Sequence, residues 1–186
     1  MIGYAFCGSF CTLGASIASL EAIVNAGHDV LPIMSENAYS TDTRFQTASD
    51  FVTRVEDITK KKVIHTVKDA EPLGPFTPLD ALIIAPCTGN TLSKLSSGIT
   101  DTAVTMAAKA HLRRDRPLLI ALASNDAMSQ SLSSIARLLT RRSVYFVPMR
   151  QDDPIKKPYS LVADMSSIPE SLDEMMKGNQ IRPLFL

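Results

Sequence analysis

Short apolar runs alternate with longer amphipathic runs along nearly the whole chain. The short runs are rich in Ile, Val, Leu and Ala and lack a regular alternation of apolar and polar residues, which is typical of strands covered on both faces. The longer runs have the length of helices. Strands that alternate with helices in this way indicate βαβ units around a parallel sheet. The pattern therefore predicts an α/β protein.

The boundaries of these runs give the expected elements to within about two to four residues. Strands are expected at residues 2–7, 29–34, 81–85, 118–123 and 144–147. Helices are expected near residues 12–26, 49–59, 102–113, 131–140 and 166–177, and Gly27 can take the left-handed conformation that closes the first of them. The expected fold is a three-layer, Rossmann-like or flavodoxin-like open parallel sheet with helices on both faces.

The length of the chain suits one domain. With 186 residues, 45% of them hydrophobic, it can bury a substantial core. We expect residues 1–186 to form a single domain, with a C-terminal helix and tail from about residue 161. Residues 36–49 and 150–160 have compositions typical of surface loops that carry function. The prolines between residues 71 and 78 exclude a regular helix or a central strand there.

The charges and cysteines exclude several classes of protein. Nineteen basic and nineteen acidic side chains cancel, so nucleic acid is not an expected partner. The first residues lack the basic flank and apolar core of a secretory signal, and no apolar stretch has the length to cross a bilayer, so no membrane partner is expected. Three cysteines without a CxxC pair argue against disulfides and a structural metal site, and indicate the cytoplasm.

The loop after the first expected strand combines a glycine with hydroxyl groups at a helix start. Gly8 permits a tight turn, and the hydroxyls of Ser9 and Thr12 lie beside free helix-start amides, an arrangement that suits a phosphate. The loop is neither a GxGxxG fingerprint nor a P-loop. A simple helix cap is the alternative. After the second expected strand, Ser35 is a further candidate phosphate contact.

The loop after the third expected strand is the most specific signal in the chain. Thr88, Asn90 and Thr91 can hydrogen-bond a phosphate or the polar edge of a heterocycle, while Pro86 and Gly89 fix the backbone close to the ligand. A second polar loop, Ser124-Asn125-Asp126, follows the next strand. Ligands of open parallel sheets bind beyond the carboxyl ends of the strands. We therefore expect these loops to line one crevice that takes a phosphate-bearing small molecule.

These segments resemble motifs of the FMN-binding decarboxylase-like flavoproteins. Residues 85–91, followed by Lys94, Gly98 and Asp101, are similar to their PxTxNT segment and downstream helix. Gly8-Ser9 resembles their phosphate loop, and Ser124-Asn125 stands where they carry an Ala-Met-Asn motif. Within that superfamily, residues 40–45, 70–75, 125–127, 145–148 and 151–160 are similar to the B subunits of dipicolinate synthase. The resemblance covers nearly the whole chain.

The resemblance implies a subunit that contributes, during sporulation, to the nicotinamide-dependent oxidation of dihydrodipicolinate to dipicolinate. It implies FMN as cofactor, the Rossmann-type A subunit of dipicolinate synthase as the partner through which NADP acts, and assembly with further copies of the chain. The residues matched to FMN binding are Gly8, Ser9, Thr12, Ser35, Pro86, Thr88, Gly89, Asn90, Thr91, Ser124 and Asn125. The alternatives are an FMN-binding module and an FMN-dependent decarboxylase. Residues 71–78 lack the catalytic histidine of the cysteine decarboxylases, which disfavours the latter.

A small dianionic substrate needs a fixed cation. Arg44 is the first candidate, because a guanidinium grips a carboxylate through two parallel hydrogen bonds; Lys156 and Lys157 come second. Asp126 is a candidate substrate contact and proton acceptor, or else a helix cap. No catalytic residue is identified, since orienting the substrate and the hydride acceptor can suffice. His28, His65 and His111 are expected to be surface or capping histidines. Cys7 and Cys11 are expected to pack in the core, and Cys87 is expected to be a buried thiol beside the crevice.

Overall fold

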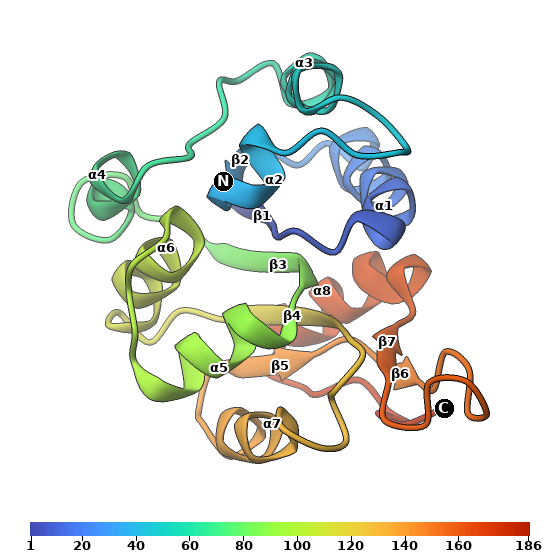
Figure 1. Ribbon diagram of the computed structural model, residues 1–186. Helices are drawn as coiled ribbons and strands as arrows, with labels where there is room; N and C mark the ends of the chain where they lie inside the picture. The colour runs from blue at the N-terminus through green and yellow to red at the C-terminus, as the bar shows by residue number, and fades with distance from the viewer.

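The five expected strands lie side by side in one sheet (Figure 1). The computed structural model describes residues 1–186. Its parallel strands have the order β2-β1-β3-β4-β5, which is the flavodoxin-like order, so the predicted fold class is confirmed. The strands are β1 (Ile2–Phe6), β2 (Val30–Met34), β3 (Ala81–Cys87), β4 (Leu118–Ser124) and β5 (Val144–Phe146).

Two short antiparallel strands extend this sheet, and the sequence did not predict them. β7 (Leu161–Ala163) pairs antiparallel with β4, and β6 (Met149–Arg150) pairs antiparallel with β7. The reason is geometric: β5 covers β4 only from Leu118 to Ile120, which leaves the carboxyl-terminal part of that edge for β7. Residues 161–163, at the start of the predicted C-terminal helix and tail, form β7, and the C-terminal α-helix itself begins later, at Ile168.

The expected helices form close to their predicted bounds. Gly27 follows the first helix with φ +91°, as the predicted helix stop requires. Two short helices were not predicted: α2 (Glu36–Ser40) lies where a loop was expected, and α4 (Val67–Ala70) precedes the proline-rich segment. None of the helices combines the length and the apolar character needed to cross a membrane. The longer helices are α1 (Leu13–Asn25), α3 (Ala48–Thr59), α5 (Gly89–Ser97), α6 (Ala103–Leu112), α7 (Leu132–Leu139) and α8 (Ile168–Met176).

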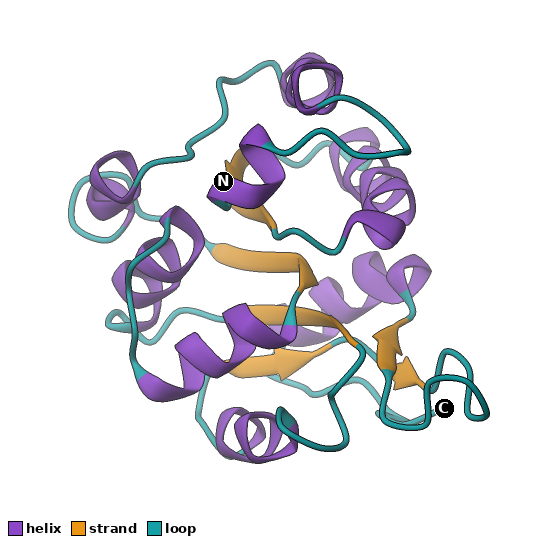
Figure 2. Cartoon of the chain, viewed as in Figure 1, coloured by secondary structure: helices purple, strands orange, loops and turns teal.

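Helices cover both faces of the sheet, and each face has its own apolar core (Figures 1 and 2). Successive strand residues point to opposite faces. In β1, Tyr4 and Phe6 therefore pack with α1, α3 and α8, whereas Ala5 packs with α4, α5, α6 and α7. This layering leaves the carboxyl ends of the strands as the open edge where the strand-to-helix loops gather.

Candidate functional site

Three strand-to-helix loops meet at the carboxyl end of the sheet and line a cavity of about 470 Å³, the main cavity. The loops follow β1, β3 and β4. The strand order reverses between β1 and β3, and ligands of open α/β sheets bind at such a switch point. The structure thus places nine of the predicted site residues around one hollow: Gly8, Ser9, Thr12, Thr88, Gly89, Asn90, Ser124, Asn125 and Asp126.

The loop after β1 is held by its own hydroxyl groups. Thr12 Oγ1 donates to the Ser9 carbonyl at 2.9 Å and contacts Ser9 Oγ at 3.1 Å. Gly8 lies against the neighbouring loop, because a Cβ at this position would approach Asn37 Cβ to 3.2 Å. Neither Ser9 nor Thr12 caps a helix with its side chain. The simple helix cap that the sequence left open is therefore not what these hydroxyls do.

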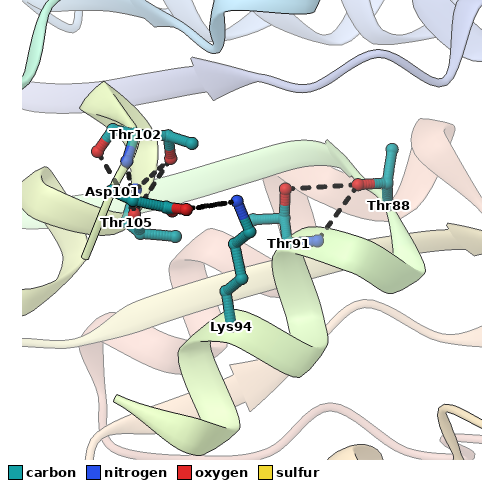
Figure 3. A network of polar contacts seen from close by, with 6 residues as sticks. All are labelled: Thr88, Thr91, Lys94, Asp101, Thr102 and Thr105. Atoms are coloured by element: carbon teal, nitrogen blue, oxygen red, sulfur yellow. Dashed lines mark hydrogen bonds and ion pairs between the residues drawn. The ribbon is translucent and has the colours of Figure 1, made fainter. Parts of the chain in front are cut away.

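The loop after β3 ends in a capped helix that points its amino terminus at the main cavity. Thr88 is the N-cap of α5, and its Oγ1 accepts from the Thr91 amide at 3.2 Å (Figure 3). Thr91 Oγ1 in turn donates to Cys7 Sγ at 3.3 Å. The first-turn amides of Gly89 and Asn90 have no acceptor within the helix. An α5 amino terminus lined with hydroxyls and free amides favours an anionic group nearby.

Gly89 permits a close approach between α5 and the loop after β4. A Cβ at this position would lie 2.5 Å from Ser124 Oγ, 2.8 Å from Asp126 Oδ1 and 2.9 Å from Ser131 Oγ. These three side chains form one network, in which the hydroxyls of Ser124 and Ser131 both donate to Asp126 Oδ1. Asp126 Oδ2 makes no hydrogen bond within the chain. The network fixes the carboxylate while leaving one oxygen available at the cavity wall.

A second cavity, of about 350 Å³, adjoins the main cavity and shares Gly8, Thr88 and Asn90 with it. Its wall also contains Lys94, whose Nζ pairs with Asp101 at 2.8 Å (Figure 3). The ammonium holds the pKa of the Asp101 carboxyl below its usual range. Two further predicted residues, Ser35 and Thr91, line this second cavity. The two adjoining cavities together give one site lined mostly by polar residues.

Three predicted residues lie differently from what the sequence suggested. Ser35 Oγ accepts from the Ala38 amide at 3.3 Å, so the side chain caps α2. Pro86 is inside β3 and lines neither cavity. Arg44 also lines neither cavity, and its guanidinium lies 4.8 Å from the centre of the Phe45 ring. Phe45 itself lines the main cavity.

The main cavity has a single cation in its wall, and it is Lys157. This lysine forms an ion pair with Asp152, which also lines the cavity, and the carboxylate raises the pKa of the lysine. Lys157 lies in the segment between β6 and β7. Sequence reasoning ranked it behind Arg44, because no sequence pattern shows which loop cation faces the cavity.

The cysteines differ in exposure, and one expectation about them was wrong. Cys7 and Cys87 are buried, and burial raises the pKa of Cys7 to about 11 and that of Cys87 well above its usual value. Both are therefore thiols at neutral pH. Cys11 was expected to pack in the core, but it is exposed and lines the main cavity, because residues 10–12 form a 3₁₀ turn at the surface.

The histidines lie outside both cavities. His65 stacks on Tyr39 with ring centres 3.7 Å apart. His111 was expected at the surface but is only 1% exposed, and its Nε2 contacts the Pro117 carbonyl at 2.8 Å. It is buried because α6 packs against α4, α5 and the sheet, which leaves few of its residues exposed. No histidine is thus placed to act on a ligand at this site.

Comparisons with known proteins agree on one family. Residues 2–176 match the family described as Flavoprotein. The chain is 40% identical over 185 residues to the B subunit of dipicolinate synthase from Bacillus subtilis (strain 168), covering 100% of this chain and 92% of that protein. The crystal structure of the B subunit of dipicolinate synthase from Bacillus halodurans C has a TM-score of 0.91 at 37% identity and covers 100% of this chain and 95% of its own.

A more distant solved structure shares the fold. It is a dodecameric FMN-dependent Ubix-like decarboxylase from Escherichia coli O157:H7, with a TM-score of 0.63 and 21% identity, covering 80% of each chain. At this identity the likeness shows the fold alone.

Proposed function

This chain belongs to the flavoprotein family and is a homologue of the B subunit of dipicolinate synthase, and from that premise we propose that it is the flavin-binding subunit of a cytoplasmic oxidoreductase that makes dipicolinate. The proposed reaction, during sporulation, is the nicotinamide-dependent oxidation of dihydrodipicolinate to dipicolinate. The observation that carries this proposal is the identity of 40%, across the whole chain, to the B subunit from Bacillus subtilis.

The proposed cofactor is FMN, and the donor groups of the two cavities fit it. A flavin phosphate needs hydroxyl and amide donors, which the loop after β1 and the start of α5 supply. When bound, FMN supplies a ring system that accepts or donates a hydride. The residues proposed to hold it are Gly8, Ser9, Thr12, Ser35, Thr88, Gly89, Asn90, Thr91, Ser124 and Asn125. Pro86 supports them from within β3, where its carbonyl accepts from the Cys7 amide at 3.2 Å.

The proposed substrate is a small dianion that binds in the main cavity beside Asp126. Removing two hydrogens from a dihydropyridine releases a hydride to the acceptor and a proton to a base. Asp126 Oδ2 makes no hydrogen bond within the chain, while Oδ1 is fixed by two serines. We propose that Asp126 is the base that accepts this proton from the substrate. The cations proposed to hold the carboxylates are Lys157, in the cavity wall, and Arg44, whose guanidinium lies over the ring of Phe45.

The proposed partners are the Rossmann-type A subunit of dipicolinate synthase, through which NADP acts, and further copies of this chain. The name of the Bacillus subtilis relative implies a second subunit. Assembly with further copies of this chain is part of the proposal; the fold neighbour from Escherichia coli is described as dodecameric. In this proposal the flavin site faces the A subunit, so that a hydride can pass between FMN on this chain and the nicotinamide on the partner.

A reconstitution experiment tests the proposal. The purified chain is mixed with the A subunit, NADP and dihydrodipicolinate, and the absorbance of the pyridine product is followed. We expect a rate well above that of the same mixture without this chain. Equal rates with and without this chain would refute the proposed function.

The same assay tests Asp126 with a matched control. Asp126→Asn keeps the shape of the side chain but removes its capacity to take a proton, so we expect turnover to fall about 100-fold or more while FMN affinity is retained. Asp173→Asn, on the exposed face of α8, should leave both unchanged. Turnover of Asp126→Asn within twofold of wild type would show that the proton goes elsewhere.

A further inference from the structure

A third hollow lies at the carboxyl-terminal end of α5, the end opposite the main cavity. We call it the α5–α6 groove; its volume is about 250 Å³. α5 has its N-cap, Thr88, at the main cavity and its C-cap, Gly98, at this groove. Nine helical residues span about 13 Å. The groove is therefore distinct from the main cavity, and it shares no lining residue with the second cavity, whose Lys94 and Asp101 are sequence neighbours of Leu95 and Thr100 in the groove.

The groove has an apolar floor and a basic rim. Leu95 and Leu112 are buried beneath it, and Ile99 is 47% exposed within it. The three charged residues in its wall are all cations: Lys109, Arg113 and Arg141. None of them forms an ion pair, and no acidic side chain lines the groove.

The three cations stand near helix carboxyl termini, whose partial negative charge attracts cations. That partial charge is too small to balance all three cations. Arg113 is the C-cap of α6, Lys109 lies in its last turn, and Arg141 follows the C-cap of α7. Each helix end carries roughly −0.5 charge. The ends of α5, α6 and α7 thus oppose three full positive charges with roughly −1.5. The groove retains an excess of positive charge over its apolar floor.

We propose that the α5–α6 groove is a binding site for a small planar molecule with two carboxylates. The volume is below the roughly 300–1,000 Å³ of pockets for drug-sized ligands, so the ligand is small. The apolar floor takes the face of a ring. The guanidinium groups of Arg113 and Arg141 present paired donors that match carboxylates, and Lys109 adds a third cation. This proposal stands independently of the proposed function.

Isophthalate, a benzene ring with two carboxylates, is the probe that tests it. The full-length protein is titrated with isophthalate, with and without saturating FMN, while affinity is measured by calorimetry and backbone amide shifts by NMR. We expect binding in both conditions, with shifts centred on Ile99, Arg113 and Arg141. The neutral diamide of the same shape should bind at least about tenfold more weakly, because it cannot form charge-assisted hydrogen bonds.

A variant that lacks the three positive charges, compared with a control variant, tests whether isophthalate binds in the α5–α6 groove. Lys109→Gln/Arg113→Gln/Arg141→Gln should raise the Kd at least about tenfold, whereas Arg137→Gln/Arg142→Gln, exposed on or just after α7 but outside the groove, should leave it unchanged. Equal affinity of the triple variant, equal loss in the control, or shifts confined to the main cavity would overturn the proposal. A protein that fails to bind FMN but still binds isophthalate would count only against the proposed function.

Discussion

Replacing Gly89 with alanine tests whether the close approach between α5 and the loop after β4 shapes the site. The added Cβ would lie within 3.0 Å of Ser124 Oγ, Asp126 Oδ1 and Ser131 Oγ. Real Cβ atoms do not approach other atoms so closely, so the serines must rotate and the carboxylate must shift. Both hydrogen bonds to Asp126 Oδ1 are then disturbed.

The expected magnitude follows from opposing effects. Overpacking a tight site costs about 1–3 kcal/mol, and a hydrogen bond to a charged group contributes about 1.5–3 kcal/mol. Alanine gains at most about 1 kcal/mol of helix propensity over glycine. Rotating the serines relieves the overlap at the expense of their hydrogen bonds, so the two costs do not add. We therefore expect Gly89→Ala to lower the free energy of unfolding by about 1–3 kcal/mol and to raise the Kd for FMN about tenfold, which is about 1.4 kcal/mol of binding free energy.

Urea unfolding and flavin titration measure the two effects, and Gly14→Ala is the control. Gly14 also lies in the first turn of a helix, but a Cβ there meets no atom within 4 Å. This control should be as stable as wild type or more stable by up to about 1 kcal/mol. With a urea dependence of about 2 kcal/mol per molar, the two variants should differ by about 1 M in midpoint. Equal midpoints and equal FMN affinity would refute the reasoning.

Three further predictions concern charge, capping and pH. Lys157→Gln should raise the KM for the dianionic substrate about tenfold with no change in FMN affinity. Lys156→Gln, which lies outside the cavity, should leave the KM unchanged. An unchanged KM in both variants would show that Lys157 does not bind the substrate. Thr102→Ala removes the capping box of α6 and should cost about 1 kcal/mol in urea unfolding, which an unchanged midpoint would contradict. Burial lowers the pKa of His111, so the unfolded chain takes up a proton first, and stability should fall as the pH drops below about 6.5. His111→Gln should flatten that dependence, and an equally steep loss in the variant would assign it to other groups.

The architecture was predictable because buried parallel strands leave a strong signal. β3 and β4 are runs of apolar residues with polar residues just beyond, so both the strands and the loops that follow them could be placed from sequence. The rule that ligands bind beyond the carboxyl ends of such strands then brought distant segments together. The gathering of Ser9, Thr88 and Asn125 around one cavity follows from that reasoning.

The details that sequence reasoning missed depend on contacts that no local pattern encodes. β7 has three residues, too few to show a period, and it exists because β5 leaves part of the β4 edge free. Lys157, rather than Arg44, reaches the main cavity because its segment follows a turn in which Asp153 Oδ1 accepts from the amides of residues 155 and 156, at 3.1 and 2.9 Å. Ser35 could have been recognised as a helix cap, since serine before a short polar run is a common N-cap.

Titration of the purified wild-type chain with FMN, followed by flavin fluorescence and visible absorbance, tests the central claim most directly. We predict saturable binding with one FMN per chain and a perturbed flavin spectrum, or a protein that is already yellow on purification. A colourless protein whose presence leaves the fluorescence and the spectrum of added FMN unchanged would contradict the assignment of the two polar cavities as a flavin site.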